Sequence, residues 1–366
     1  MDKGYLKHVQ IGEDMSIKEA MRQMDSTAFK ILFVVDKHDR FLGTVTDGDF
    51  RRWILSQGSL EDAVVRVCNK SSIVFSSDKY DISTVEKILI ENRIEAVPLV
   101  DENRYIVDVL FWEDLFGGDF VKQKRKLNVP VAIMAGGMGT RFSTVTKILP
   151  KPLIPFGEKP IVEVIMDNFA DFGCKNFYLL LGYKAAMIQS YFENSTSGYF
   201  PVYKLESEPG GTAGALRLLD GESLGEVFFV SNCDIIIKAD YADIYDFHVA
   251  NRHDITVVTA MRHFVIPYGV METTTGGSLK VITEKPEYDF LVNTGMYVVN
   301  REVLSLIPKK DKFHFTDLLK KAQKNNRKVG VYPVSEKSWF DIGQPELWET
   351  STSDFYNSFT KGKERE

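Results

Sequence analysis

A glycine-rich segment follows a short apolar run near the middle of the chain and has the residue types that bind phosphate. The candidate phosphate contacts are Ala135, Gly136, Gly137, Gly139, Thr140, Arg141 and Lys151. Glycines at the end of a strand leave backbone N–H groups free to approach a phosphate, and the two cationic side chains add positive charge. A tight turn is the alternative explanation for the glycines. The combination of Gly-x-Gly-Thr-Arg with a later Pro-Lys-Pro favours phosphate binding.

This segment differs from the two common phosphate-binding motifs. No Gly-Lys-Ser/Thr follows it, so it is not a P-loop, and Phe142 stands at the third glycine position of the dinucleotide fingerprint. We therefore expect a phosphate site of another kind, on a strand and loop that begin at Val131.

Apolar runs and helical stretches alternate after this loop. The runs with the length and composition of buried strands are Phe177–Leu181, Val227–Val230 and Ile255–Thr259. Ile161–Phe172 has a helical pattern. The alternation predicts an α/β domain with a largely parallel sheet. We expect this domain to occupy residues 128–352, with the end of a C-terminal helix and a tail over residues 353–366.

The first third of the chain contains an internal repeat. Ile31–Asp36 recurs as Ala96–Asp101, and Phe41–Asp49 recurs at the same offset as Ile106–Asp114. Each repeat opens with an amphipathic helix and continues with two short strands and a closing helix. We therefore expect two similar small domains in tandem.

A change of composition marks the end of the repeats. Residues 117–126 combine two glycines with a basic run, which is typical of an exposed linker. We expect the tandem pair to occupy residues 1–118, in units of about 1–60 and 61–118, and the linker to occupy residues 119–127.

Both repeats have a capping-box pattern at the start of their first helix. Ser16 pairs with Glu19, and Ser83 pairs with Glu86. The pattern predicts that each serine is the residue immediately before its helix.

Composition and charge exclude several classes of function. The 366 residues have a net charge of −6 and a mean hydropathy of −0.15, so no overall positive field attracts nucleic acid or an anionic membrane. Met1–Gln10 has no apolar signal region, and no run has the eighteen or so apolar residues of a membrane span. Three widely spaced cysteines fit neither a disulfide framework nor a zinc site. We expect a cytoplasmic protein.

The repeat resembles a pair of cystathionine-β-synthase (CBS) domains, a family whose pairs often bind adenine nucleotides between the repeats. The family's ligand pattern is met by Gly43, Thr46 and Asp49. The resemblance implies that Thr46 contacts a phosphate and Asp49 the ribose of a purine nucleotide. The second repeat has Asp108 and Phe111 at the first two places, so at most one cleft matches. The alternative is that Asp49 caps a helix and that the pair serves dimerisation.

From about residue 129 to residue 348 the chain resembles the sugar-1-phosphate nucleotidyltransferases, also called nucleoside-diphosphate-sugar pyrophosphorylases. After the glycine-rich segment, the matching pieces are ESEPGGTAGAL (Glu206–Leu216), SNCD (Ser231–Asp234), YGV (Tyr268–Val270), EK (Glu284–Lys285), NTG (Asn293–Gly295) and WFDIG (Trp339–Gly343). Cys233 is a departure, because most relatives have glycine there. Each piece alone has a structural explanation such as a cap, a strand edge or a hairpin ion pair, but their common order favours the family. The resemblance implies a Rossmann-like, GT-A-like fold with a mixed, mainly parallel sheet.

In this family an oxygen of a sugar-1-phosphate attacks the α-phosphorus of a nucleoside triphosphate and releases pyrophosphate. The resemblance implies that Arg141 holds the triphosphate, Lys151 neutralises charge near the α-phosphate and Lys285 binds the phosphate of the sugar. It implies that Asp234 and Asp341 hold Mg²⁺. The other residues that it places against nucleotide or sugar are Glu206, Gly211, Thr212, Gly269, Glu284, Asn293 and Thr294. No general base or covalent nucleophile is implied, and Cys233 is expected to be a small packed residue.

Glu206 indicates which base the chain uses. Guanine has two adjacent donors that one carboxylate can accept, whereas uracil and thymine have one donor flanked by carbonyl oxygens. Relatives that use guanosine resemble this chain in having Glu-x-Glu-Pro-x-Gly-Thr-Ala-Gly here. We therefore expect GTP, with uridylyl or thymidylyl transfer as the alternative. In another alternative, Glu206 points into solvent and the backbone holds the base.

The order of domains resembles that of guanylyltransferases from bacterial legionaminic acid pathways, which implies glucosamine-1-phosphate as the acceptor. Mannose-1-phosphate and heptose-1-phosphate are the alternatives. A different class of function is a non-catalytic, nucleotide-sensing subunit. The presence of the full set of charged residues, Arg141, Lys151, Asp234, Lys285 and Asp341, favours an enzyme. We expect a homo-oligomer.

Overall fold

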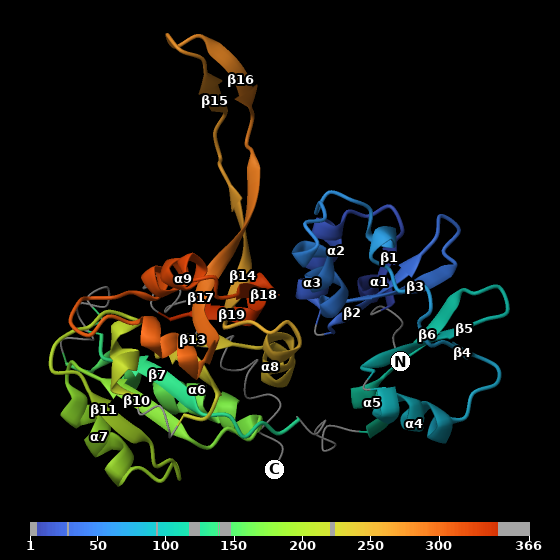
Figure 1. Ribbon diagram of the computed structural model, residues 1–366. Helices are drawn as coiled ribbons and strands as arrows, with labels where there is room; N and C mark the ends of the chain where they lie inside the picture. The colour runs from blue at the N-terminus through green and yellow to red at the C-terminus, as the bar shows by residue number, and fades with distance from the viewer. Residues whose placement is uncertain are drawn as a thin grey trace. The chain divides into compact units, whose positions relative to one another are not determined.

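The computed structural model describes residues 6–27, 29–92, 94–116, 125–137, 139, 148–219 and 224–342. The chain divides into two compact units, with the boundary between residues 122 and 123 (Figure 1). The first unit contains the internal repeat, and the second contains the glycine-rich segment. Among the described residues, no helix combines the length and the apolar character that crossing a membrane requires.

The N-terminal unit repeats one topology twice. Its first repeat consists of α1 (Leu6–Val9), β1 (Gln10–Gly12), α2 (Ile17–Ser26), β2 (Ile31–Val35), β3 (Phe41–Thr46), α3 (Asp47–Leu55) and the 3-10 turn η2 (Val64–Arg66). Its second repeat consists of β4 (Phe75–Ser76), α4 (Ile82–Asn92), β5 (Ala96–Val100), β6 (Ile106–Phe111) and α5 (Trp112–Phe116). In each repeat the first strand is parallel and the last antiparallel to the middle strand. The middle strands begin at Ile31 and Ala96, which are also the first residues of the matching sequence runs, and this confirms the repeat.

One apolar core joins the two repeats. It contains Phe33 and Phe41 from the first repeat and Val109 and Phe111 from the second. The ring of Phe111 also stacks on Phe29, with centroids 3.8 Å apart. Because both sheets bury apolar residues in this shared core, the repeats stabilise each other.

The two expected capping boxes have different outcomes. Ser16 accepts a hydrogen bond from the backbone N–H of Glu19, and the Glu19 carboxylate accepts from the backbone N–H of Ser16, which confirms the first box. The second expectation is wrong. Helix α4 already begins at Ile82, and the carboxylate of Asp81 accepts the backbone N–H of Thr84 at 2.9 Å. Aspartate is at least as good a cap as serine, so the acid that precedes Ser83 sets the start.

The C-terminal unit has a central sheet of seven strands among the described residues. Its elements are β7 (Val131–Ala135), η4 (Lys151–Leu153), β8 (Pro155–Phe156), β9 (Lys159–Pro160), α6 (Ile161–Asp171), β10 (Phe177–Leu181), α7 (Ala185–Asn194), β11 (Val202–Leu205), η5 (Gly214–Leu218), β12 (Val227–Asn232), β13 (Ile235–Ile237), α8 (Tyr241–Ala250), β14 (Ile255–Val265), β15 (Val270–Thr273), β16 (Leu279–Thr283), β17 (Glu287–Asn300), η6 (Arg301–Leu306), α9 (Phe315–Lys324), β18 (Val329–Val334), η7 (Glu336–Ser338) and β19 (Trp339–Asp341). The strand order is β11-β10-β7-β12-β17-β14-β18, and four of the six neighbouring pairs are parallel. The mixed, mainly parallel sheet of the sequence analysis is therefore confirmed.

Helices cover both faces of this sheet. Val131 and Ile133 of β7 belong to a core that also contains residues of α6, α7 and α8. Ala132, between them, belongs to a second core with residues of α9. Alternate side chains of a strand point to opposite faces, so the apolar run of β7 is explained by burial on both sides.

A long ribbon extends from this sheet (Figure 1). Strands β14 and β17 pair antiparallel as far as Val265 and Glu287, and the chain between them forms the hairpin of β15 and β16. We call residues 264–291 the arm. The arm contains the YGV and EK motifs, so its position decides where those residues lie.

Candidate active site

Four parallel strands, β7, β10, β11 and β12, end at one edge of the sheet. We call this the carboxyl edge. The residues that follow the strands are Gly136, Gly182, Glu206 and the pair Cys233 and Asp234. In open α/β sheets, ligands bind at this edge. The glycine-rich segment, the ESEPGG segment and the SNCD motif therefore lie around one region.

The glycine-rich segment is held between two neighbours. A Cβ on Gly182 would lie 2.8 Å from the carbonyl oxygen of Gly136, so the ends of β7 and β10 approach more closely than a side chain permits. The carboxylate of Glu206 lies over Gly136, because a Cβ built there would overlap Oε2 of Glu206. Gly139 has a φ of 63°, which favours glycine. Thr140 and Arg141 lie outside the described residues.

Glu206 also organises the loop that follows it. Its Oε1 accepts the backbone N–H of Gly210 at 3.0 Å. The next residues are attached to the start of α9: the N–H of Phe315 donates to the Thr212 hydroxyl at 3.0 Å, and Gly211, with a φ of 84°, lies against the backbone of Phe313. Gly211 and Thr212 thus have contacts within the fold, and Glu206 links the glycine-rich segment to this loop.

A hollow of about 590 Å³ opens beside the same loop. Four cationic side chains and two carboxylates line it, together with Gly210: Arg217, Lys309, Lys310, Lys312, Glu208 and Asp311. The lysines provide the local positive charge that an acidic chain needs for binding anions.

The two aspartates of the sequence analysis are brought together by a short antiparallel pair. Strand β13 pairs with β19 so that Ile235 is opposite Asp341, and the N–H of Ile342 donates to the carbonyl oxygen of Asp234 at 2.9 Å. The backbones of two aspartates that are far apart in sequence are therefore neighbours in the fold. No group of three or more metal-binding side chains occurs among the described residues. Two carboxylates suit Mg²⁺, which completes its coordination with water and substrate phosphates.

Lys151 is an ion-pair partner of Asp234 through Nζ and Oδ2, and both side chains are mostly buried. Lys151 begins the 3-10 turn η4, which follows Pro150. The lysine and the aspartate therefore belong to one charged site. A cation bound by Asp234 would compete with Lys151 and free its ammonium group for a phosphate.

Cys233 is a core residue. It is buried among the apolar residues of the sheet, and burial raises the pKa of its thiol to about 12. A thiol with such a pKa is a poor nucleophile at neutral pH, which agrees with the expectation from sequence.

The NTG motif forms a bulge at the carboxyl edge. The pairing of β14 with β17 shifts between Val258 and Thr259, and Gly295 has a φ of 90° and lies against the Asn232 side chain at the end of β12. Asn293 is exposed and accepts the N–H of Gly295 at 2.9 Å. Thr294 differs from the expectation, because its hydroxyl is buried and donates to the carbonyl oxygen of Val258 at 2.7 Å. Thr294 holds the bulge, and Asn293 is the exposed side chain of the pair.

The remaining motif residues lie on the arm. Gly269 packs against the carboxylate of Glu284, where an added Cβ would lie 2.9 Å from Oε2. Lys285 follows directly, with a φ of 46°, at the turn between β16 and β17. Asn293 is six positions along the extended strand from Glu287, which corresponds to about 20 Å. The structure therefore brings Gly269 and Glu284 together but does not bring them, or Lys285, to the carboxyl edge of their own chain.

The sequence analysis did not single out Gly182 and Asn232, although both border the site. A signal for Gly182 exists, because a glycine directly follows the apolar run Phe177–Leu181 in the same way that Gly136 follows β7. Asn232 lies within the SNCD motif, but its contact with Gly295 has no signal in the sequence, since the contact depends on the pairing of β12 with β17.

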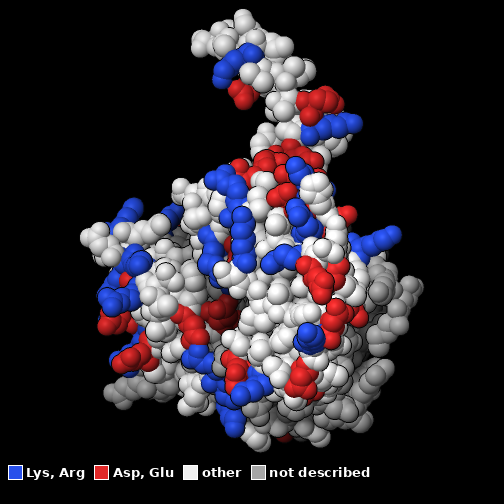
Figure 2. Space-filling view, turned by 90° about the vertical axis from the view of Figure 1, so that its right-hand side faces the viewer, with Lys and Arg blue, Asp and Glu red and all other residues white. Residues whose placement is uncertain are grey.

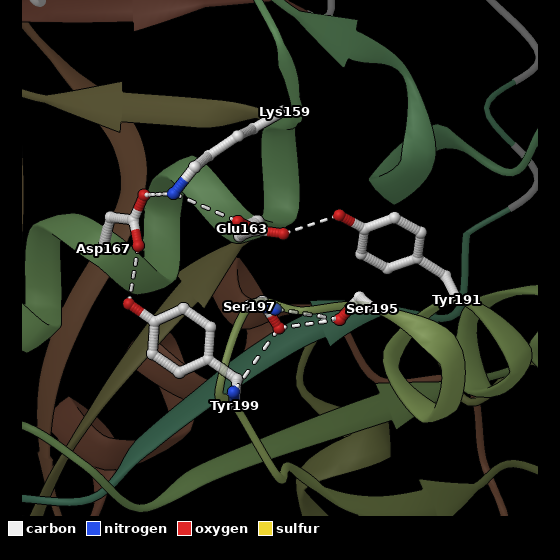
Figure 3. Close-up of polar contacts among 7 residues, drawn as sticks. All are labelled: Lys159, Glu163, Asp167, Tyr191, Ser195, Ser197 and Tyr199. Atoms are coloured by element: carbon white, nitrogen blue, oxygen red, sulfur yellow. Dashed lines mark hydrogen bonds and ion pairs between the residues drawn. The ribbon is translucent and has the colours of Figure 1, made fainter.

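A polar cluster connects α6 to α7 and to the segment before β11 (Figure 3). Glu163 on α6 is only 4% exposed, accepts a hydrogen bond from the Tyr191 hydroxyl on α7 and pairs with Lys159. Lys159 also pairs with Asp167, whose carboxylate accepts the Tyr199 hydroxyl at 2.6 Å. Burial alone would lower the pKa of Lys159, but its bonds to the two carboxylates outweigh burial and raise it. Both carboxylates are paired within the fold, so the cluster serves to hold these elements together.

The first repeat of the N-terminal unit shows how its ligand-pattern residues are used. The carboxylate of Asp49 accepts the backbone N–H of Thr46 at 2.8 Å and its hydroxyl at 2.6 Å, and it also pairs with Arg52. Thr46 and Asp49 thus form the cap of α3. A Cβ on Gly43 would overlap the carbonyl oxygen of Asn69, so close packing accounts for this glycine.

Comparison with known proteins adds to this geometry. A family model described as nucleotidyl transferase matches residues 131–355. The chain belongs to the nucleotidyl transferase family. A second model, described as CBS domain, matches residues 6–56, so a CBS domain precedes the nucleotidyl transferase domain.

Several known proteins are similar to the nucleotidyl transferase domain. Mannose-1-phosphate guanyltransferase of Saccharomyces cerevisiae is 30% identical over 243 residues, which cover 63% of this chain and 65% of that protein. The chain thus spans just under two thirds of the length of this relative. D-glycero-alpha-D-manno-heptose 1-phosphate guanylyltransferase of Aneurinibacillus thermoaerophilus is 27% identical over 215 residues, which cover 58% of this chain and 93% of that protein. The crystal structure of HddC from Yersinia pseudotuberculosis has a TM-score of 0.49 and 26% identity, covering 62% of this chain and 99% of that one.

Proposed function

We propose that the chain is a sugar-1-phosphate guanylyltransferase that converts GTP and a sugar-1-phosphate into a GDP-sugar and pyrophosphate. One observation carries the proposal: a glycine-rich strand end, the carboxylate of Glu206 and the charged site of Lys151, Asp234 and Asp341 share one edge of the sheet. An oxygen of the sugar phosphate forms a bond to the α-phosphorus of GTP, and the bond from that phosphorus to the β-phosphate oxygen breaks. The attacking phosphate is already ionised at neutral pH, so no general base is required.

The chain's own residues position two anions and neutralise their charge. The backbone N–H groups after β7, together with Ala135, Thr140 and Arg141, would hold the triphosphate. Lys151 would lie against the α-phosphate, where negative charge increases during the attack. Asp234 and Asp341 would hold Mg²⁺, which supplies charge neutralisation between the phosphates when it is bound.

Glu206 supports guanine as the base. Its Oε1 is occupied by Gly210, but a carboxylate has about four acceptor positions, so Oε2 and the free lone pairs can accept from guanine N1–H and N2–H₂. The mannose-1-phosphate and heptose-1-phosphate relatives are named as guanylyltransferases. The cationic hollow beside Gly210 adds attraction for a polyanionic nucleotide.

The acceptor that we propose first is glucosamine-1-phosphate, from the resemblance in domain order. The names of the relatives make mannose-1-phosphate and heptose-1-phosphate the direct competitors. An assay of pyrophosphate release with GTP, UTP, dTTP and ATP against the three sugar phosphates tests base and sugar together. Highest turnover with GTP is expected. Pyrophosphate release with UTP or dTTP alone would overturn the assignment of guanine as the base. No release in any combination would favour a non-catalytic subunit.

We also propose that the first CBS cleft binds a purine nucleotide and that the bound nucleotide changes the rate of the enzyme. Because Asp49 and Thr46 cap α3, binding would exchange contacts within the cap for contacts with ligand. Titration calorimetry of the whole chain with AMP or ATP is expected to give one site per chain. The site should disappear in Asp49→Asn. No heat would leave dimerisation as the role of the pair.

A further inference from the structure

The arm exposes an unusual amount of apolar surface. Of the large hydrophobic side chains that are exposed among the described residues, half lie within this single hairpin. They are Phe264, Val265, Tyr268, Met271, Leu279, Val281, Ile282, Tyr288, Phe290 and Leu291. Figure 2 shows that uncharged side chains cover much of the arm's surface. Exposed apolar surface of this extent marks a contact with another molecule.

The arm cannot bury these side chains by itself. It is a two-stranded ribbon, and such a ribbon has no second layer on which to pack. Ten side chains that are each about half exposed offer on the order of 800 Å² of apolar surface. This is the area that each partner buries in a standard protein interface.

The extended form of the arm is fixed at its base. The pairing of β14 with β17 continues without a shift from Thr259 to Val265. Nδ1 of His263 lies 2.8 Å from the Asp289 carboxylate across the ribbon, and Arg262 pairs with Glu336 at 3.0 Å. These contacts direct the arm away from the sheet. Folding the arm back onto the carboxyl edge of its own chain would break the pairing of β14 with β17 and these ion pairs.

The arm also contains Lys285, whose positive charge the proposed reaction would require at the carboxyl edge. The family resemblance implies that Lys285 binds the phosphate of the sugar in the proposed reaction, yet Lys285 lies more than six strand positions, about 20 Å, beyond Asn293. One side chain does not span that distance. The site of a single chain is therefore incomplete with respect to Lys285 and Glu284.

We propose that the arm docks on a second copy of this chain and supplies its Lys285 and Glu284 to the carboxyl edge of that copy. The inference rests on the proposed function. A second copy is favoured over an unrelated protein because reciprocal exchange covers both arms and completes both sites with one symmetric contact.

Mixing two inactive variants tests the exchange. Lys285→Ala removes the residue supplied by the arm, and Asp341→Asn removes a carboxylate at the carboxyl edge. In a mixed dimer, the intact edge of the Lys285→Ala chain receives the intact arm of the Asp341→Asn chain, so one of two sites works. Co-expression in equal amounts is expected to restore about one quarter of wild-type turnover, because half of the dimers are mixed. Turnover no higher than that of the separate variants would overturn the proposal.

A second experiment is independent of activity. The photoreactive residue p-benzoylphenylalanine replaces Tyr268 on the arm, which is 74% exposed, in the whole chain. Irradiation is expected to give a product of twice 41.6 kDa, with the crosslink next to β13 or β19 of the partner. The control replaces Phe200, which is 93% exposed and precedes β11 at the far end of the strand order, and is expected to give no such product. Crosslinks within one chain, or from arm to arm only, would overturn the proposal. Absence of turnover in the wild type would refute the proposed function instead and leave the crosslink to decide the docking.

Discussion

The substitution Gly182→Ala, at the end of β10, is expected to displace the glycine-rich segment at the end of the neighbouring strand β7. The new Cβ would lie 2.8 Å from the carbonyl oxygen of Gly136 and 3.2 Å from its Cα, and no rotamer change can move these backbone atoms. Ordinary contacts begin near 3.4 Å, so the ends of β7 and β10 must separate by about 0.6 Å. Overpacking of this kind costs about 1–3 kcal/mol of unfolding free energy. Because misplacement by about 1 Å can cost about 100-fold in rate, we expect kcat/KM to fall at least about 10-fold.

Thermal unfolding and pyrophosphate release measure the two effects separately. Gly182→Ala is expected to lower Tm by several degrees in a unit of this size. The matched control is Gly137→Ala, which adds the same methyl group where no atom of the described residues lies within 4 Å, so its Tm should equal that of the wild type. If Gly182→Ala kept both the wild-type Tm and the wild-type kcat/KM, close approach of the two strand ends would not position the segment.

Three further predictions concern charge. Asp341→Asn is expected to lower kcat at least about 100-fold with an unchanged Tm, because an amide cannot supply the charge that Mg²⁺ requires; a dependence of turnover on Mg²⁺ identical to that of the wild type would contradict this. Glu206→Gln is expected to shift the ratio of GTP to UTP turnover toward UTP at least about 10-fold, since an amide has one donor and one acceptor side; an unchanged ratio would show that Glu206 does not contact the base. Burial lowers the pKa of His253 to about 4, below its ordinary value of 6.5, so the unfolded chain binds a proton between these values and the folded chain does not. The unfolding free energy should therefore fall between pH 7 and pH 5, and urea titrations should show a fall smaller by about 1–2 kcal/mol in His253→Gln.

The repeat and the sheet could be predicted from sequence because their signals are local. The constant offset between matching runs fixes the order of strands in the second repeat once the first is known. The run Phe177–Leu181 coincides with β10, because a strand buried on both faces is apolar at every position. The expected start of α4 was wrong because Asp81 and Ser83 compete for the same role, and the pattern alone does not rank them.

The sequence motifs predicted which residues belong to the candidate site more fully than they predicted where those residues lie. Asp234 and Asp341 meet through β13 and β19, whose short pairing has no signal in the sequence. Thr294 was expected against a sugar, yet the shift in pairing at Val258 turns its hydroxyl into the sheet. The YGV and EK motifs on the arm indicate which residues could bind a sugar phosphate, but not how far these residues lie from the carboxyl edge. That distance depends on how far β14 and β17 remain paired.

Transfer of label from GTP tests the central claim most directly. With GTP labelled with ³²P at the α-phosphate and a sugar-1-phosphate acceptor, the account predicts that the label appears in a nucleotide sugar. With GTP labelled at the γ-phosphate, the label should appear in pyrophosphate. Release of the γ-label as free phosphate, with the α-label remaining in GDP, would show cleavage at a different bond and would contradict guanylyl transfer at the carboxyl edge.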